Sequence, residues 1–297
     1  MRSLSLIIRF LLAIPFFASE VSRADDEDFS KVVFKATPLT SSVHMLEGAG
    51  GNITALVGSE GTLLVDDDFA PMADKLLAKL RELGGDSPRF IVNTHFHYDH
   101  TGGNEVFGRS ATIIGAKTLR ERLKTEQTLW KELHPPAAPQ ALPTVTFEST
   151  LTLHLNGEEV RVLHLPHGHT DGDAVVFFEN AKVASLGDLY FSGMYPIFHP
   201  EHDGSLEGYA KNIALVLKQI PPGARVVPGH GPLSTKAELA RYHAMILASI
   251  KLVKKAKRAG QSMEQVLKAG MPAEWEPFSH GYLSTDKWLA LVYKNIR

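Results

Sequence analysis

Short apolar runs and longer helical patterns alternate along this chain. Near the start, three runs have the length and the bounding turn residues of strands, at 43–47, 52–57 and 62–65. A segment with apolar residues at helical spacing follows at 71–83, and a short apolar strand comes next at 90–92. The first part of the chain is therefore predicted to be rich in strands.

A similar succession fills the rest of the chain. The predicted elements are a strand at 112–115, a helix at 116–133, a loop rich in Pro and Ala at 134–143, a hairpin of 150–155 with 159–164, a second hairpin of 174–178 with 181–185, a helix at 206–220, a strand at 225–227, and helices at 234–259, 262–269 and 285–296. Loops such as 134–143, carried on a rigid scaffold, often line a functional site.

Two similar runs of strands followed by helices suggest two sheets packed face to face. With helices on the outside, this is a four-layer αββα sandwich of the α+β class. The pattern alone also allows an α/β arrangement, and the candidate ligands described below favour the sandwich. No repeat or low-complexity linker interrupts the sequence, so we expect one domain from 28 to 297.

Composition narrows the function classes. The chain has 297 residues and a hydrophobic fraction of 44%, enough for a substantial core. Its 31 Lys and Arg nearly balance its 33 Asp and Glu, which gives no basic footprint for nucleic acid. It contains no cysteine, so neither a disulfide nor a thiolate ligand is available. The expected partner is a small-molecule substrate, and the oligomeric state is open.

The N-terminus has the features of a secretory signal peptide at 1–24. Arg2 provides a positive start, an apolar stretch runs over 4–18, and Ala24 stands at the expected cleavage point before an acidic run. Arg9 interrupts the apolar stretch, which leaves it short for the alternative of a membrane anchor. We therefore expect a secreted or periplasmic protein that is not inserted in the membrane after cleavage.

The strongest chemical signal is the segment His95-Phe-His-Tyr-Asp-His100. It holds four potential metal ligands in six positions, directly after a predicted strand. In an extended segment His95 and His97 point the same way, so both can bind one ion. Asp99 and His100 begin the next turn and can face a neighbouring ion. Glycines at 102 and 103 allow the backbone to bend there.

Three later residues stand at similar places. His169 lies in a loop with the sequence HGHTDGD, Asp188 follows an apolar strand in LGD, and His230 lies in PGHG at another strand end. Any one of them alone would be uninformative. Together they complete a plausible ligand set at the ends of several strands.

These motifs, in this order and spacing, resemble those of the metallo-β-lactamase superfamily over most of the chain, from the strand at Asp66 to the helix after His230. The resemblance implies that His95, His97 and His169 hold one metal ion. It implies that Asp99, His100 and His230 hold a second, with Asp188 bridging the two. A hydroxide between the ions would be the nucleophile, and Asp99 and His230 are the residues that we count as catalytic.

Nitrogen and oxygen ligands without sulfur favour two Zn²⁺ ions, although manganese or iron would also bind such a set. A bound metal lowers the pKa of water from about 15.7 to about 7, so hydroxide is available at neutral pH. The sequence has no G-x-S-x-G motif for a serine nucleophile.

Several residues are candidates for supporting roles. One of the three aspartates at 66–68, foremost Asp66, is expected to hydrogen-bond a ligand imidazole, or else the three form an acidic cluster before a helix. Asp173 is a candidate for orienting the His169 loop. The expected substrate pocket consists of an apolar wall and two histidines that either line the pocket or are solvated: Tyr190, Phe191, Tyr195, His199 and His202.

The predicted reaction is hydrolysis of a carbonyl substrate, a β-lactam-like cyclic amide or a lactone or ester. Related lactamases use Cys at the position of Asp188 and Lys at that of Phe191, so strong binding of anionic lactams is not expected. The full ligand set also resembles the thioesterases of the glyoxalase type, which remain an alternative. A second alternative is an iron sulfur-dioxygenase, which uses one metal on a similar scaffold.

Overall fold

The computed structural model describes residues 28–129 and 132–296, so the predicted signal peptide lies outside the described residues. It contains two large sheets. In the first, β1 to β4 are antiparallel neighbours and β4, β5, β6 and β9 run parallel. Its strands are β1 (Lys35–Pro38), β2 (Val43–Glu47), β3 (Ile53–Leu56), β4 (Thr62–Val65), β5 (Pro88–Val92), β6 (Thr112–Ala116) and β9 (Val145–Phe147).

The second sheet repeats this scheme in the C-terminal half. Its first four strands are antiparallel neighbours, β14 joins β13 in parallel, and β15 closes the edge. Its strands are β10 (Thr150–Leu155), β11 (Glu158–His164), β12 (Ala174–Phe178), β13 (Val183–Ser185), β14 (Arg225–Val227) and β15 (Ser234–Thr235).

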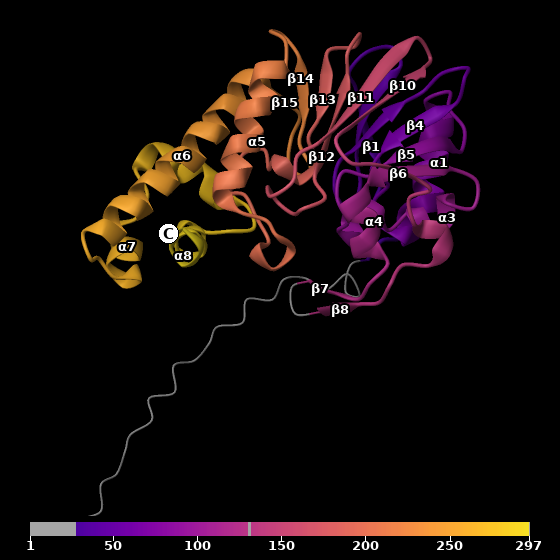
Figure 1. The fold of residues 1–297 in the computed structure, drawn as a ribbon. Helices are drawn as coiled ribbons and strands as arrows, with labels where there is room; N and C mark the ends of the chain where they lie inside the picture. Colours follow the sequence, from indigo (N-terminus) through magenta and orange to yellow (C-terminus); the bar gives the residue numbers. More distant parts are fainter. Residues whose placement is uncertain (1–27, 130–131, 297) are drawn as a thin grey trace, which may run out of the picture.

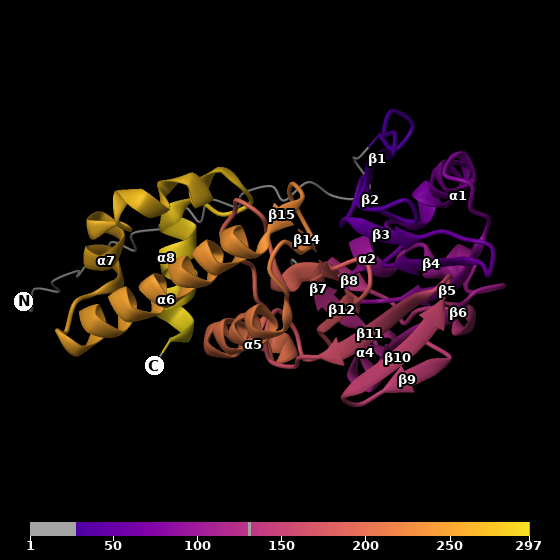
Figure 2. The same cartoon turned by 90° about the horizontal axis from the view of Figure 1, so that it is seen from above.

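Helices cover the outer faces of both sheets (Figures 1 and 2). In Figure 1, α1 lies outside the first sheet and α5 and α6 lie outside the second, with α7 and α8 packed beyond α6. The α-helices are α1 (Ala73–Glu82), α2 (Tyr98–Thr101), α3 (Asn104–Phe107), α4 (Lys117–Leu123), α5 (Leu206–Gln219), α6 (Lys236–Arg258), α7 (Met263–Ala269) and α8 (Thr285–Asn295). Short 3₁₀ turns lie at 70–72, 139–141, 187–189, 200–202 and 273–280.

Three separate apolar clusters correspond to the three interfaces between four layers. One joins α1 to the first sheet through Leu76 and Leu64. A second lies between the sheets, and a third joins the second sheet to α5 and α6. Strand β12 is apolar throughout because both of its faces are buried. Val176 faces the cluster between the sheets, and Val175 faces the helices. The predicted αββα sandwich is confirmed.

The predicted helix at 116–133 is wrong in its second half. Helix α4 ends at Leu123, and a small hairpin follows, with strands β7 (Gln127–Leu129) and β8 (Glu132–His134). The cause is local, because the Thr125 hydroxyl and the Gln127 amide both donate to the carbonyl oxygen of Arg122, at 3.1 and 3.0 Å. These side chains satisfy a carbonyl group that a further helical turn would have used.

Some short elements were not predicted. Strands β1 and β9 are edge strands of four and three residues, and they are too short to show a clear alternation. The predicted helix at 234–259 begins at Lys236, since Thr235 and Glu238 form a capping box there. Within the described residues, no helix has the length and apolar character that a bilayer crossing requires.

Candidate metal centre

The seven predicted ligands come from the ends of strands in both sheets. His95, His97, Asp99 and His100 lie in the segment that follows β5 and continues into α2. The other three come from the second sheet: His169 lies between β11 and β12, Asp188 follows β13, and His230 follows β14. Three chain segments of the second sheet thus meet one segment of the first.

Four of these residues form a buried group. The donor atoms of His95, His97, His169 and Asp188 lie within 4.8 Å of one another. Nδ1 of His97 is 2.9 Å from Nε2 of His169, and Oδ2 of Asp188 is 3.3 Å from the same Nε2. Nε2 of His95 is 3.7 Å from Oδ2 of Asp188. These atoms surround one point from several sides, as the ligands of a single ion do.

Asp99, His100 and His230 form a second group next to the first. Their donor atoms also lie within 4.8 Å of one another. Oδ2 of Asp99 is 3.1 Å from Nε2 of His230 and 3.4 Å from Nε2 of His100. The other carboxylate oxygen of Asp188, Oδ1, is 3.1 Å from Nε2 of His100. Asp188 therefore directs one oxygen to each group.

Hydrogen bonds to the Nδ1 atoms orient most of these rings. Oδ2 of Asp66 lies 2.8 Å from Nδ1 of His100, and the Asp66 carboxylate also accepts from the backbone N–H and the hydroxyl of Thr94. Nδ1 of His169 donates to the carbonyl oxygen of Ile197 at 2.8 Å. A proton held at Nδ1 leaves the lone pair of Nε2 for a cation. Asp66, rather than Asp67 or Asp68, makes this contact.

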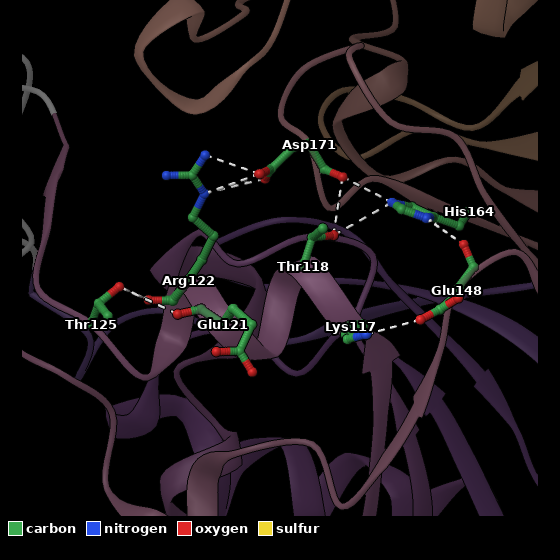
Figure 3. Close-up of a pocket in the computed structure, with 8 residues that line it drawn as sticks. All are labelled: Lys117, Thr118, Glu121, Arg122, Thr125, Glu148, His164 and Asp171. Atoms are coloured by element: carbon green, nitrogen blue, oxygen red, sulfur yellow. Dashed lines mark hydrogen bonds and ion pairs between the residues drawn. The ribbon is translucent and has the colours of Figure 1, made fainter.

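Asp173 orients the backbone of the His169 loop. Its carboxylate accepts from the backbone N–H of His169 at 2.7 Å and from the N–H and hydroxyl of Thr170. At the outer side of this loop, Arg122 of α4 binds the carboxylate of Asp171 at 2.9 Å (Figure 3). These contacts hold both ends of the turn that presents the His169 imidazole.

The polar cleft in Figure 3 is separate from the ligand groups. It has a volume of about 530 Å³ and is bounded by α4, by Glu148 and by His164, with Asp171 at its edge. None of the seven predicted ligands lines it. A second pocket of about 430 Å³ lies against the ligand segment, between Tyr98 and the predicted loop at 134–143.

Burial sets the protonation states of the first group. It lowers the pKa of His95 and His97 well below the usual value and that of His169 to about 4. Burial also raises the pKa of Asp188, but the surrounding imidazoles more than offset this effect, and its pKa is lowered. At neutral pH the group therefore consists of neutral imidazoles and a carboxylate, the forms that bind metal.

In the second group, neighbouring carboxylates favour the protonated form of both imidazoles. Burial opposes the charged form of His100, but Asp99 and Asp188 raise its pKa well above the usual value. The pKa of His230 is raised for the same reason, with Asp188 as its largest favourable partner. A cation bound there would displace these protons and neutralise the same carboxylates.

Glycine is required where the backbone approaches the ligands. A Cβ atom on Gly229 would collide with Oδ1 of Asp188, and one on Gly51 would collide with the imidazole of His100. The site therefore depends on residues with no side chain on two neighbouring loops.

The donor set fits metal ions. It contains five imidazoles and two carboxylates, the ligands that zinc and similar transition metals take in proteins. Nε2 of His95 is buried and has no hydrogen-bond partner among the described residues, which is costly unless another group binds it. The geometry thus provides two adjacent ligand groups that could each hold a cation and that share Asp188.

Comparison with known proteins decides the family. The model of the metallo-beta-lactamase superfamily matches residues 46–230, more than half of the chain and the part that holds all seven residues. The chain belongs to the metallo-beta-lactamase superfamily. Members of this superfamily are typically metal-dependent hydrolases.

Curated relatives are similar in sequence to about half of this chain. A hydroxyacylglutathione hydrolase of Pelagibacter ubique is 27% identical over 153 residues, which are 48% of this chain and 51% of the relative. One of Synechococcus sp. strain JA-3-3Ab is 28% identical over 166 residues, 54% of this chain and 55% of the relative. The chain thus spans about half the length of these relatives.

Solved structures show the same fold. A metallo-beta-lactamase from Pontibacter korlensis superposes with a TM-score of 0.60 at 21% identity, over 72% of this chain and 99% of that one. The sec-alkylsulfatase Pisa1 from Pseudomonas sp. gives a TM-score of 0.70 at 12% identity, over 88% of this chain and 50% of that one. At these identities the likeness concerns the fold alone.

The predicted apolar wall of the substrate pocket is wrong for Tyr190 and Tyr195. Both side chains are buried in the core of the protein. The Tyr190 hydroxyl lies 2.6 Å from Oγ of Ser234, and Tyr195 stacks on Trp288. Phe191 is also buried, so the prediction is wrong for this residue too, and its ring stacks on that of His230. The three aromatic side chains have almost no exposed surface to offer a substrate, and Phe191 instead supports the ligand His230.

His199 and His202 are buried, so the interpretation that they are solvated is wrong. Their rings pack beside the first ligand group, with His199 next to His97 and His169. Neither lines the two pockets described above.

Two contacts of the site were not predicted. The hydroxyl of Tyr282 lies 3.2 Å from Nδ1 of His230, and the side-chain amide of Asn52 donates to the carbonyl oxygens of Pro228 and Gly231. Both residues stand far from His230 in the sequence and within no motif. Only the tertiary structure identifies them.

Proposed function

We propose that this chain is a secreted hydrolase with two zinc ions that cleaves a neutral lactone, ester or cyclic amide. The observation that carries the proposal is the division of the Asp188 carboxylate between two groups of ligands. Two cations held there would lower the pKa of a bound water to about 7 and polarise a substrate carbonyl. The apolar segment at 4–18 supports secretion.

Exposure indicates the side from which substrate would reach the ions. The side chains of Asp99 and His230 are 16% and 12% exposed, whereas those of His95 and His169 are 1% exposed. Asp99 and His230 would therefore face the substrate, which supports their assignment as catalytic residues. Tyr282, which is exposed and contacts His230, lies on the same side.

Charge around the site favours a neutral substrate. Among the described residues, the ion pairs of lysines and arginines involve neither Asp99 nor Asp188. The pocket beside Tyr98 is lined mainly by apolar side chains, includes Glu105 and Glu132, and contains no lysine or arginine. This pocket would thus offer an anionic substrate no lysine or arginine as a partner.

A second candidate is hydrolysis of a thioester. The two curated relatives are named hydroxyacylglutathione hydrolase, and their similarity covers about half of this chain. The same pair of metal ions would serve this reaction, because thioesters and lactones both react at a carbonyl carbon.

A substrate panel separates these candidates. We expect the zinc-loaded chain to hydrolyse an acyl lactone and an aryl ester faster than a chromogenic cephalosporin, with benzylpenicillin bound weakly. A glutathione thioester as the preferred substrate would favour the second candidate. A micromolar Michaelis constant for benzylpenicillin would contradict the inference from charge, since another group would then hold the carboxylate.

A further inference from the structure

A third cluster of histidines lies next to the first ligand group. The ring nitrogens of His97, His199 and His202 lie within 4.8 Å of one another. All three side chains are buried, with residue exposures of 1%, 5% and 5%. His199 and His202 lie at the two ends of the 3₁₀ turn at 200–202, which brings both rings to the same side of the loop as His97.

His199 has the hydrogen bond that is typical of a metal-binding histidine. Its Nδ1 lies 3.0 Å from Oε1 of Glu201, and this contact lowers the pKa of Glu201 to about 2. A carboxylate that holds Nδ1–H directs the lone pair to Nε2, as the Ile197 carbonyl does for His169. His199 therefore presents Nε2 in the form that binds a cation.

His202 supplies an independent sign of a missing ligand. Its Nδ1 is buried and has no hydrogen-bond partner within the described part of the chain. A buried nitrogen without a partner is unfavourable, because it has lost its hydrogen bonds to water. The edge of the Phe96 ring packs against His202, so no polar group from that side can compensate.

We propose that His97, His199 and His202 form a third cation site that shares the His97 imidazole with the first ion. Nδ1 of His97 lies 2.9 Å from Nε2 of His169, so we assign Nε2 of His97 to the additional cation. A cation bound there would replace the Nε2 proton, which would pass to solvent, and His97 would then be a ligand of both ions. The inference rests on the proposed function only in assigning Nδ1 of His97 to the first ion.

Three imidazoles without a thiolate select Zn²⁺, Cu²⁺, Ni²⁺ or Co²⁺ over Mg²⁺ and Ca²⁺. Binding is weaker here than at the first two positions, because a third cation is added beside two others. The Glu201 carboxylate, which is 56% exposed at the rim, offsets part of this repulsion. The third ion is therefore expected to exchange with solvent while the first two stay bound.

The test is a zinc titration of the full chain. Protein that retains two ions after dialysis is titrated with Zn²⁺ by calorimetry, and bound zinc is counted by mass spectrometry. We expect about one further ion per chain. H202Q should keep the first two ions and lose the third. H154Q, at an exposed histidine of β10, controls for adventitious surface binding and should keep all three.

Glu201→Gln provides a second variant at an exposed position, where folding is not at risk. It should weaken the third site about tenfold or more without changing the first two. Saturation at two ions in the wild-type chain, or a third ion that survives in H202Q, would overturn the third site alone. A chain that binds no zinc at all would contradict the proposed function as well.

Discussion

At the scale of single residues, the ligand set and two supporting residues, Asp66 and Asp173, were accessible from sequence, and the other supporting contacts were not. The spacing of His95, His97, Asp99 and His100 requires only a strand and a turn to bring them together. The contact of Tyr282 with His230, by contrast, depends on how the C-terminal segment folds back over the site. Contacts of this kind have no local signal, because the partners are separated by 52 residues.

Asp66 should act on metal affinity through His100. Asp66→Asn removes the carboxylate that fixes the Nδ1 proton of His100, so we expect metal affinity to fall about 10- to 100-fold. Equilibrium dialysis against a zinc buffer measures this change. Asp74→Asn, at an exposed position of α1, is the matched control and should bind zinc as the wild type does. Equal zinc affinities of the two variants would show that Asp66 does not act on metal binding.

His169 should make the stability of the metal-free chain depend on pH. Its pKa is lowered from 6.5 to about 4 by burial, so the unfolded chain binds more protons between these values. The contribution of His169 to the free energy of unfolding is complete above pH 6.5 and is lost as the pH falls through about 4. It amounts to about 3 kcal/mol, since one pKa unit corresponds to about 1.4 kcal/mol.

The comparison of wild type with His169→Gln isolates this effect. Buried acids such as Asp173, whose pKa is raised by burial to about 8, have the opposite pH dependence and contribute to both proteins. Urea unfolding of both metal-free chains should show the advantage of the wild type shrinking by about 3 kcal/mol from about pH 7 to about pH 4. A difference in the free energy of unfolding that does not change with pH would mean that burial does not keep His169 neutral.

At the scale of elements, the regular strands and helices followed from periodicity, and the irregular segments did not. Strand β4 was predicted with its observed bounds, because its apolar run is enclosed by turn residues. The hairpin of β7 and β8 was missed because 124–134 keeps a helical distribution of apolar residues. Side-chain hydrogen bonds from Thr125 and Gln127 end the helix there, and periodicity does not register them.

Helix α6 depends on its capping box. Thr235→Ala removes the side chain that accepts from the backbone N–H of Glu238, so we expect a loss of about 1 kcal/mol in the free energy of unfolding. Denaturant unfolding measures it. Zinc content should not change, because α6 carries none of the seven ligands. A variant that unfolds normally but loses metal would show that α6 supports the site more directly than its contacts indicate.

At the scale of the whole molecule, the candidate metal centre lies where loops of the two sheets meet. Four ligands follow β5 of the first sheet, and three come from loops of the second. Ions bound at this junction stabilise only the folded arrangement, by about 4 kcal/mol when free metal is a thousandfold above its dissociation constant. Removing the metal with a chelator should lower the unfolding temperature by roughly 10 °C.

Calorimetry of the chelated and zinc-loaded chains tests this coupling. Thr235→Ala should lower both unfolding temperatures by a similar amount, since its effect is independent of the ions. Equal unfolding temperatures with and without zinc would contradict the view that the ions hold the two sheets together.

The metal content of the purified chain, after exhaustive dialysis against metal-free buffer, is the most direct measurement of the central arrangement. Asp188 and the six other side chains that divide around its carboxylate should retain two zinc ions per chain, and His97→Ala should lose at least one of them together with most hydrolytic activity. A wild-type chain that retains a single iron ion, or a His97→Ala variant that keeps both zinc ions and full turnover, would contradict the account.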